Sequence, residues 1–209
     1  MGESNPLAET LKFYKDLGVT HLNLNPPSLD SVESGIRECA RCGLSSGRSG
    51  FLAGWGSPGA ELLLVADALN EISLREGLPV SGDSWDLLQK IIKAIDIEPK
   101  DVYLTNAVKC YADGKAKPTA NEIEACRPWL LSQLELVDPV VVVALGTVAA
   151  QALLATDQVI SSIRGRFYFL DKYPVMPTFH PEYLLHHPRS KAEVWHDMKM
   201  VRDKLGQGR

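Results

Sequence analysis

Short apolar runs alternate with longer amphipathic segments between residues 60 and 205, and this alternation constrains the fold more than any other feature. The runs are brief, mostly β-branched and bounded by Gly, Pro or Asp, as buried strands are. They cover residues 60–67, 101–107, 139–145 and 173–179. Helical spacing of apolar residues marks 83–97, 119–137, 146–156 and 190–205. This order predicts an α/β fold with a mainly parallel sheet covered by helices on both faces.

The segment 119–137 also carries its own start signal. Thr119 fits a helix N-cap, and Glu122 follows three residues later, which together make a capping box.

In parallel sheets, ligand sites form at the carboxyl ends of the strands. The side chains at the ends of the predicted strands are therefore the candidates for function.

Length and composition suit one domain with an appendage. The chain has 209 residues and is 45% apolar, enough for a real core. We assign residues 39–209 to this domain and residues 1–38 to an N-terminal appendage, with a helix near 7–17 and a linker, NLNPPSLD. The N-terminus lacks a basic region followed by an apolar stretch, and no apolar run approaches the roughly 20 residues of a membrane span. We expect a cytoplasmic protein without membrane association.

Charge is unevenly distributed along the chain. The net charge of −4 argues against coating of nucleic acid through bulk electrostatics. Residues 164–209 nevertheless hold nine Lys or Arg and five Asp or Glu, which gives that segment +4. Such a segment allows a local phosphate-facing surface, although ordinary variation along a solvated face explains it equally well.

The chain has four cysteines, spaced as C-x2-C, a gap of 67 residues, C, a gap of 15 residues, and C. A disulfide framework is disfavoured because the chain shows no export signal and cytosolic thiols stay reduced. Structural zinc sites usually pair two short C-x2-C knuckles, which this chain lacks. On chemistry alone, four thiolates suit a [4Fe–4S] cluster about as well as zinc. Two unrelated pairs of buried cysteines are a third explanation.

From about residue 39 to residue 205 the chain resembles the family 4 uracil-DNA glycosylases, the iron–sulfur branch of the uracil-DNA glycosylase superfamily. The resemblance is carried by ECARCGL, by DVYLTNAVKC followed by PTANEIEACRPWLLSQLELVDPVVVVALG, by IRGR and by PTFHPEYLL. It implies a three-layer αβα sandwich, a monomer that acts on DNA, and a structural [4Fe–4S] cluster. The ligands that it implies for the cluster are Cys39, Cys42, Cys110 and Cys126.

Three residues at strand ends suit the tasks of cutting the bond between deoxyribose and uracil. The Asn106 amide can match O4 and N3–H of uracil and reject the opposite pattern of cytosine, and by resemblance this residue reads the base. His180 can donate a hydrogen bond to uracil O2 as charge builds there, and Asp67 can orient the attacking water. Each also has an ordinary structural explanation, such as an Asn that forms a turn.

The expected contacts with DNA lie in IRGR and in the segment after His180. A proline stiffens the loop that presents the histidine, and one of two consecutive leucines could fill the gap left by a flipped base. Arginines suit phosphate contacts, although most surface arginines contact nothing special. The candidate residues are Arg164, Arg166, Pro181, Leu184, Leu185 and Arg189.

The first motif departs from the family pattern, Gly-Glu-Ala-Pro-Gly, and reads ADALN over residues 66–70. Its acidic residue is kept as Asp67, but Ala66 and Asn70 add bulk where the family keeps space for base and sugar. Val80 replaces a phenylalanine that stacks on uracil; base–aromatic stacking is worth roughly 1–3 kcal/mol. Trp85 could replace that ring or could be a core residue. The base-binding set that we expect is Ala66, Ala68, Val80 and Asn106.

Two functions stay open at this point, and we favour the first. The first is a DNA glycosylase of base excision repair that hydrolyses the N-glycosidic bond of uracil or of another deaminated base. The second is a catalytically weak or inactive iron–sulfur relative that still binds DNA. An iron–sulfur or zinc scaffold for some other partner is a third, more distant hypothesis.

Overall fold

A six-stranded sheet forms the centre of the protein. The computed structural model describes residues 15, 16, 18, 27–114 and 117–207. The strand order is β2-β4-β3-β6-β8-β7, in which β3, β4, β6 and β8 are parallel and the edge strands β2 and β7 are antiparallel. The bounds are β2 Trp55–Gly56, β3 Leu62–Ala68, β4 Val102–Val108, β6 Val141–Leu145, β7 Tyr168–Leu170 and β8 Tyr173–Thr178. The four predicted strands and their parallel arrangement are confirmed.

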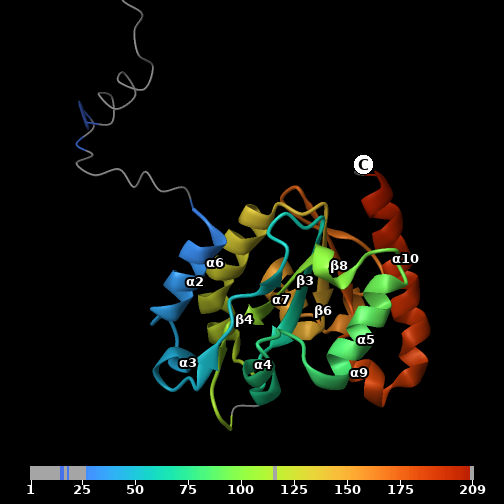
Figure 1. The fold of residues 1–209 in the computed structure, drawn as a ribbon, viewed down its shortest axis with the longest axis horizontal. Helices are drawn as coiled ribbons and strands as arrows, with labels where there is room; N and C mark the ends of the chain where they lie inside the picture. Colours follow the sequence, from blue (N-terminus) through green and yellow to red (C-terminus); the bar gives the residue numbers. More distant parts are fainter. Residues whose placement is uncertain (1–14, 17, 19–26, 115–116, 208–209) are drawn as a thin grey trace, which may run out of the picture.

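Helices cover both faces of this sheet and complete three layers (Figure 1). One face carries α2 (Leu29–Arg37), α6 (Ala120–Val137) and α7 (Thr147–Leu154). The other face carries α5 (Gly82–Lys93), α9 (Pro181–His186) and α10 (Lys191–Gln207). Four of these, α5, α6, α7 and α10, are the predicted helices, and the capping box of Thr119 and Glu122 is present at the start of α6.

The remaining elements are short connections. They are α3 (Gly43–Ser46), β1 (Gly50–Phe51), α4 (Glu71–Glu76), the 3-10 helices Pro99–Asp101 and Pro188–Ser190, β5 (Cys110–Tyr111) and α8 (Ile160–Ile163). β1 and β5 pair as a separate antiparallel ribbon, with Phe51 opposite Cys110.

The core divides into two apolar layers because side chains alternate along each strand. On β3, Leu63 and Val65 face the layer with α6 and α7, whereas Leu62 and Leu64 face the layer with α5 and α10. All four are at most 1% exposed, so β3 is buried on both faces. Such burial explains why this strand reads as a continuous apolar run.

The first segment of the chain is described only in part. The helix expected near 7–17 lies outside the described residues apart from 15 and 16, so the appendage and its boundary stay a prediction. α2, which we did not predict, begins inside that expected appendage and packs on α6. A Cβ at Gly35 would come within 2.7 Å of the Trp129 ring, which shows how closely α2 approaches α6.

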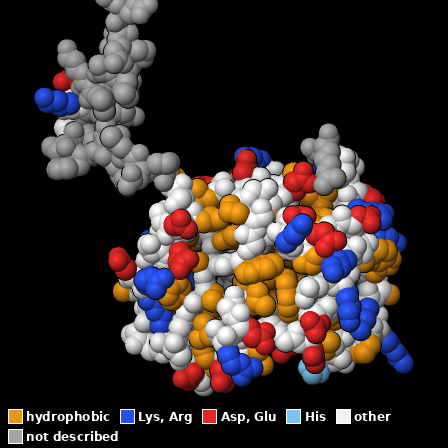
Figure 2. All heavy atoms as spheres, in the orientation of Figure 1, with side chains coloured by type: hydrophobic (Ala, Val, Ile, Leu, Met, Phe, Trp, Pro, Cys, Tyr) orange, Lys and Arg blue, Asp and Glu red, His pale blue; other side chains and the backbone are white. Residues whose placement is uncertain are grey.

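Two surface properties bear on function. Among the described residues, no helix has the length and apolar character needed to cross a membrane. On the face drawn in Figure 2, basic and acidic side chains are interspersed and apolar side chains are exposed between them. That face therefore lacks the uniform positive field expected of a protein that coats nucleic acid.

Candidate active site

Strand register brings the candidate residues to one edge of the sheet. Ala66 of β3 pairs with Asn106 of β4 and with Leu145 of β6, and Leu145 pairs with Thr178 of β8. This row lies near the carboxyl ends of four parallel strands, where ligand sites form in such sheets. Asp67, Gly146 and His180 follow the row by one or two residues on β3, after β6 and after β8, respectively. They therefore lie at the same edge of the sheet.

Asn106 is buried, with 1% of its surface exposed. Its Nδ2 donates a hydrogen bond of 3.0 Å to the backbone carbonyl of Pro79. Its Oδ1 is buried and has no hydrogen-bond partner among the described residues. A buried polar atom without a partner is uncommon because it loses its hydration without compensation. A ligand that donates a hydrogen bond would satisfy it.

Asp67 is held at the start of α7. Its Oδ1 accepts a hydrogen bond of 2.9 Å from the backbone amide of Ala149. Burial raises the pKa of this carboxyl to about 6, although the Ala149 and Val148 amides lower it. Gly146 has φ of 105°, and a Cβ there would lie 2.6 Å from Asp67 Cγ. Glycine is therefore required at 146 both for its conformation and for space.

A cavity of about 970 Å³ opens beside Asp67. Its charged lining consists of four carboxylates and one ammonium group, so it is a poor place for a phosphate. Asn106, His180 and Val80 do not line it. The charged residues are Asp67, Lys117, Glu124, Asp157 and Glu182.

Asp67 and Asn106 lie on opposite faces of the sheet edge. The contact of Asp67 is with α7, whereas that of Asn106 is with the loop before α5. The sequence places both at strand ends but gives no means of separating them by face without the register. A ligand that touches both must therefore lie across the ends of the strands.

His180 caps the first turn of α9. Its Nδ1 accepts a hydrogen bond of 3.2 Å from the backbone amide of Glu182. Burial lowers the pKa of the imidazole to about 4. The ring is therefore neutral near pH 7, and because Nδ1 is the acceptor, the proton lies on Nε2.

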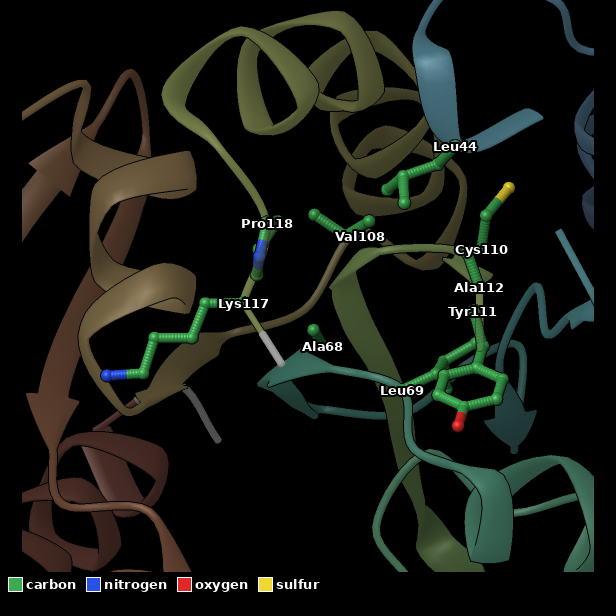
Figure 3. A pocket seen from close by; sticks show the side chains of 9 residues that line it. All are labelled: Leu44, Ala68, Leu69, Val108, Cys110, Tyr111, Ala112, Lys117 and Pro118. Carbon is green, nitrogen blue, oxygen red and sulfur yellow. The ribbon is translucent and has the colours of Figure 1, made fainter. Parts of the chain in front are cut away.

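The remaining expected base-binding residues lie at different depths. Ala66 and Val80 are 0% and 2% exposed and belong to the core layer under α5. Ala68 lines both the large cavity and a small one of about 20 Å³, drawn in Figure 3. Trp85 is partly buried and packs edge-to-face on Trp55, with ring centroids 5.2 Å apart, against the core layer under α5. 

Asn70, expected to crowd the pocket, is engaged elsewhere. Its side chain caps α4, where Oδ1 accepts a hydrogen bond of 2.8 Å from the Ser73 amide. Asn70 still borders the large cavity, but its amide is directed to the start of this helix. The bulk that the sequence adds there therefore has a structural use.

Arg164, expected to contact phosphate, has carboxylate partners in the structure. Its guanidinium donates to both carboxylate oxygens of the buried Asp197, at 2.7 and 3.2 Å, and also to Glu193. It also lies over the Phe179 ring, and its side chain is only 15% exposed. Arg164 thus ties the loop before β7 to α10. Arg166 is exposed, contacts Tyr168 and remains accessible.

Only one of the two leucines of α9 is accessible. Leu184 is 1% exposed and packs in the core, so the expectation that it enters DNA is corrected. Leu185 is 39% exposed, and Pro181, buried, forms the first turn of the helix. The sequence reasoning missed Tyr183, which is 40% exposed and stacks between Phe179 and His187. An aromatic residue three positions after His180 was the signal in the sequence that could have identified it.

The cysteines come from three parts of the fold. Cys39 and Cys42 lie around the end of α2 and the start of α3, Cys110 lies on β5, and Cys126 lies on α6. Figure 3 shows the Cys110 sulfur and the Tyr111 ring on opposite sides of β5. All four are free thiols. Burial raises the pKa of Cys110 and of Cys126, and neighbouring cysteines also raise both, which places the thiols within electrostatic reach of one another.

N–H groups point at three of these sulfurs. The donors are Trp129 Nε1 to Cys39 at 3.4 Å, Arg48 Nη1 to Cys110 at 3.5 Å and the Lys109 amide to Cys126 at 3.3 Å. Such donors stabilise thiolates and the sulfurs of iron–sulfur sites. Within the described residues, no three His, Cys, Asp or Glu side chains form a group that could hold a single metal ion.

Fold and site together define an α/β protein with a polar ligand site at the carboxyl edge of a parallel sheet and a cysteine constellation beside it. A family model described as the uracil DNA glycosylase superfamily matches residues 53–199. The chain therefore belongs to the uracil-DNA glycosylase superfamily.

Three individual relatives are similar to this chain over most of its length. The type-4 uracil-DNA glycosylase of Archaeoglobus fulgidus is 30% identical over 188 residues, which cover 86% of this chain and 94% of the relative. The type-4 enzyme of Saccharolobus solfataricus is 30% identical over 85% of this chain and 87% of its own. The type-4 enzyme of Thermotoga maritima is 33% identical over 75% of this chain and 83% of its own.

Proposed function

We propose that this chain is a uracil-DNA glycosylase that hydrolyses the N-glycosidic bond of uracil, or of another deaminated base, in DNA. The observation that carries the proposal is the buried Oδ1 of Asn106, which lacks a hydrogen-bond partner among the described residues. It lies at the carboxyl edge of the sheet, where the family's substrate is expected. The similarity to named uracil-DNA glycosylases over most of the chain supports the same function.

Base identity is read by Asn106 in this proposal. With Nδ2 committed to the Pro79 carbonyl, the free acceptor is Oδ1, and the uracil N3–H is a matching donor. Cytosine has a lone pair at N3, so it would place two acceptors against each other. A site with a buried acceptor rejects a ligand that leaves it unpaired.

The departing base is stabilised by His180. Cleavage sends the electron pair of the bond between N1 and C1′ onto the uracil ring, and part of the charge gathers at O2. Because the imidazole is neutral and protonated on Nε2, it donates a hydrogen bond to O2 without giving up a proton. The base therefore leaves as an anion that is held by hydrogen bonds.

Water is supplied from the side of Asp67. The sugar develops positive charge at C1′ as the base leaves, and a water molecule in the adjoining cavity adds its oxygen there. The carboxylate of Asp67, ionised above about pH 6, orients this water and accepts its proton, which then passes to solvent. The products are free uracil and a strand with an abasic site.

The four cysteines would hold a [4Fe–4S] cluster. The donor set fits, because there are four thiols within electrostatic reach and three N–H groups directed at their sulfurs. When bound, the cluster would serve as a structural cross-link between the segment 39–42, β5 and α6, with no redox step. We also propose that the protein acts as a monomer in the cytoplasm, where thiols stay reduced.

The DNA strand would lie over α9 and the loop before β7. Arg166 and Arg189 are exposed there, as is Leu185, whose apolar side chain can enter the gap left by a flipped base. The acidic cavity next to Asp67 disfavours phosphate, so the backbone should pass outside it.

Excision on defined oligonucleotides tests the function. Iron-loaded protein is incubated with single strands that carry one uracil or one hypoxanthine, followed by alkali and gel electrophoresis. Cleavage at uracil that disappears in His180→Ala supports the proposal. Absence of cleavage at both bases, with iron verified in the same sample, would favour the inactive DNA-binding relative.

A further inference from the structure

Lys109 is a fully buried lysine, 0% exposed, next to both the cysteines and Asn106. Its Nζ donates three hydrogen bonds of 2.6 Å, to Thr105 Oγ1, to Gln133 Oε1 and to the backbone carbonyl of Asn106. These three bonds use every proton of an ammonium group. The side chain is therefore held in one position.

None of these three acceptors is a carboxylate. The charged neighbour of this ammonium is the Cys126 thiol, which accepts no hydrogen bond from Nζ, and burial of an ammonium group is expensive because it removes hydration. An apolar side chain of similar length would fill the same space at lower cost. A lysine at this position therefore has a use other than filling the core.

Lys109 makes a second contact through its backbone. Its amide donates to Cys126 Sγ at 3.3 Å, and the next residue is Cys110. Its ammonium reaches back to the Asn106 carbonyl at the end of β4. β2 pairs only with Tyr103 and Leu104, so beyond these two residues β4 has no pairing with β2. The ammonium fixes the backbone of β4 in the gap between this pairing and the pairing of Phe51 with Cys110.

We propose that Lys109 is a positioning residue for Asn106: its ammonium fixes the backbone that presents the base-reading amide, while its amide supports Cys126. The backbone amide of Lys109 thus contacts the cysteine constellation, and its ammonium contacts the residue that reads the base. This inference rests on the proposed function of Asn106. It makes the ammonium necessary for selective base binding and unnecessary for retention of iron.

Lys109→Met separates the two roles, because methionine keeps the backbone amide and nearly the same volume. We would measure iron per chain and the Kd for two single strands by fluorescence anisotropy. One strand carries 2′-fluoro-2′-deoxyuridine, whose electron-withdrawing fluorine slows bond cleavage. The other carries a tetrahydrofuran abasic analogue, which has no base for Asn106 to contact.

The expected result is unchanged iron in Lys109→Met and a loss of selectivity for the uracil strand of about tenfold to a hundredfold, the scale of one buried hydrogen-bonding group. The abasic strand should bind with nearly wild-type Kd. Lys100→Met is the matched control, since Lys100 is exposed and precedes the opposite end of β4. It should leave iron and selectivity unchanged.

A second variant excludes a merely structural role. Lys109→Met combined with Gln133→Leu removes the ammonium together with one of its three acceptors, and the melting temperature of this variant is measured beside that of the single variant. Selectivity for uracil should stay low. Recovery of selectivity together with stability in the double variant would overturn the inference. Wild-type selectivity in Lys109→Met would also overturn it, and so would loss of iron in that variant. Absence of uracil selectivity in the wild type would instead count against the proposed function.

Discussion

The backbone amide of Ala149 donates a hydrogen bond of 2.9 Å to Asp67 Oδ1 and so joins the start of α7 to the end of β3. The same helix terminus favours a carboxylate through its dipole. Burial outweighs this effect and raises the pKa of Asp67 to about 6. A carboxylate with this pKa can gain and lose a proton near neutral pH, which suits a group that handles water.

Asp67→Asn should remove the acid limb of the pH profile. In the wild type, kcat/KM should rise with pH through about 6 as the carboxylate ionises. The folded protein binds this proton more tightly than the unfolded chain, so Asp67 lowers stability as pH rises from about 3.8 to about 6. The variant should lack that loss of stability. Single-turnover excision and thermal melts between pH 4 and 8 measure both effects, and an unchanged acid limb would contradict the role of Asp67.

Gly146→Ala should disturb the same site from the neighbouring strand. The new Cβ would meet the Asp67 carboxyl group, and alanine is strained at φ of 105°. We expect a loss of about 1–3 kcal/mol in the free energy of unfolding together with a strong loss of excision. Gly59→Ala is the control, because no atom lies within 4 Å of a Cβ there and φ is ordinary. Equal free energies of unfolding for the two variants, measured by urea melts, would contradict this account.

Asn106→Asp should weaken base discrimination and leave the cluster intact. The carboxyl group has nearly the same shape but lacks the amide that donates to Pro79, so its oxygens can no longer be oriented in the same way. We expect excision of uracil to fall by about tenfold to a hundredfold or more, the effect of one mismatched buried polar group. Iron content measured on the same preparation should equal that of the wild type. Loss of iron would show that Asn106 is mainly structural.

Cys110→Ser should lose iron and destabilise the fold. Cys110 lies on β5 and, as a cluster ligand, would tie this strand to the segment 39–42 and to α6, so removal of one ligand would release several elements at once. A fall in the melting temperature of about 10 °C or more is expected. Trp129→Phe is a useful comparison, since it removes the N–H group directed at Cys39 and leaves all four cysteines in place. It should bind iron but release it faster to a chelator. Full iron content in Cys110→Ser would contradict the ligand assignment.

Substitution of Arg164 should lower the stability of the fold, whereas substitution of Arg166 should weaken DNA binding. Arg164→Met leaves the carboxylate of Asp197 buried without its partner and should cost about 3–5 kcal/mol in the free energy of unfolding. Arg166→Ala should instead weaken binding of all DNA sequences equally and lower the slope of log Kd against log salt by about one. Urea melts and salt titrations of both variants decide this. A reduced salt slope in Arg164→Met would restore Arg164 as a phosphate contact.

Much of the fold follows from local pattern. The four central strands, four of the covering helices and the capping box of Thr119 could be predicted because apolar spacing and end signals are local properties. The short helices α2 and α4 could not, since they depend on packing against other elements. α2 gains its stability from burial of Val32 and Ile36 against the domain.

Side-chain roles were harder to predict because they depend on tertiary partners. IRGR gives no sign that Arg164 meets Asp197 from 33 residues away. The two leucines of α9 are equivalent in the sequence, and only helix orientation buries Leu184. Lys109 stands out in VKC as a charge after an apolar run, yet its burial and its bond to Asn106 become apparent only in three dimensions.

Direct detection of free uracil tests the central claim. Iron-loaded wild-type protein and His180→Ala would be incubated with a strand that carries one uracil, and the released base would be quantified by mass spectrometry. The account predicts one free uracil per abasic site formed by the wild type and little or none from the variant. An iron-loaded wild-type protein that binds the strand but releases no base would contradict it and would identify a DNA-binding relative without glycosylase chemistry.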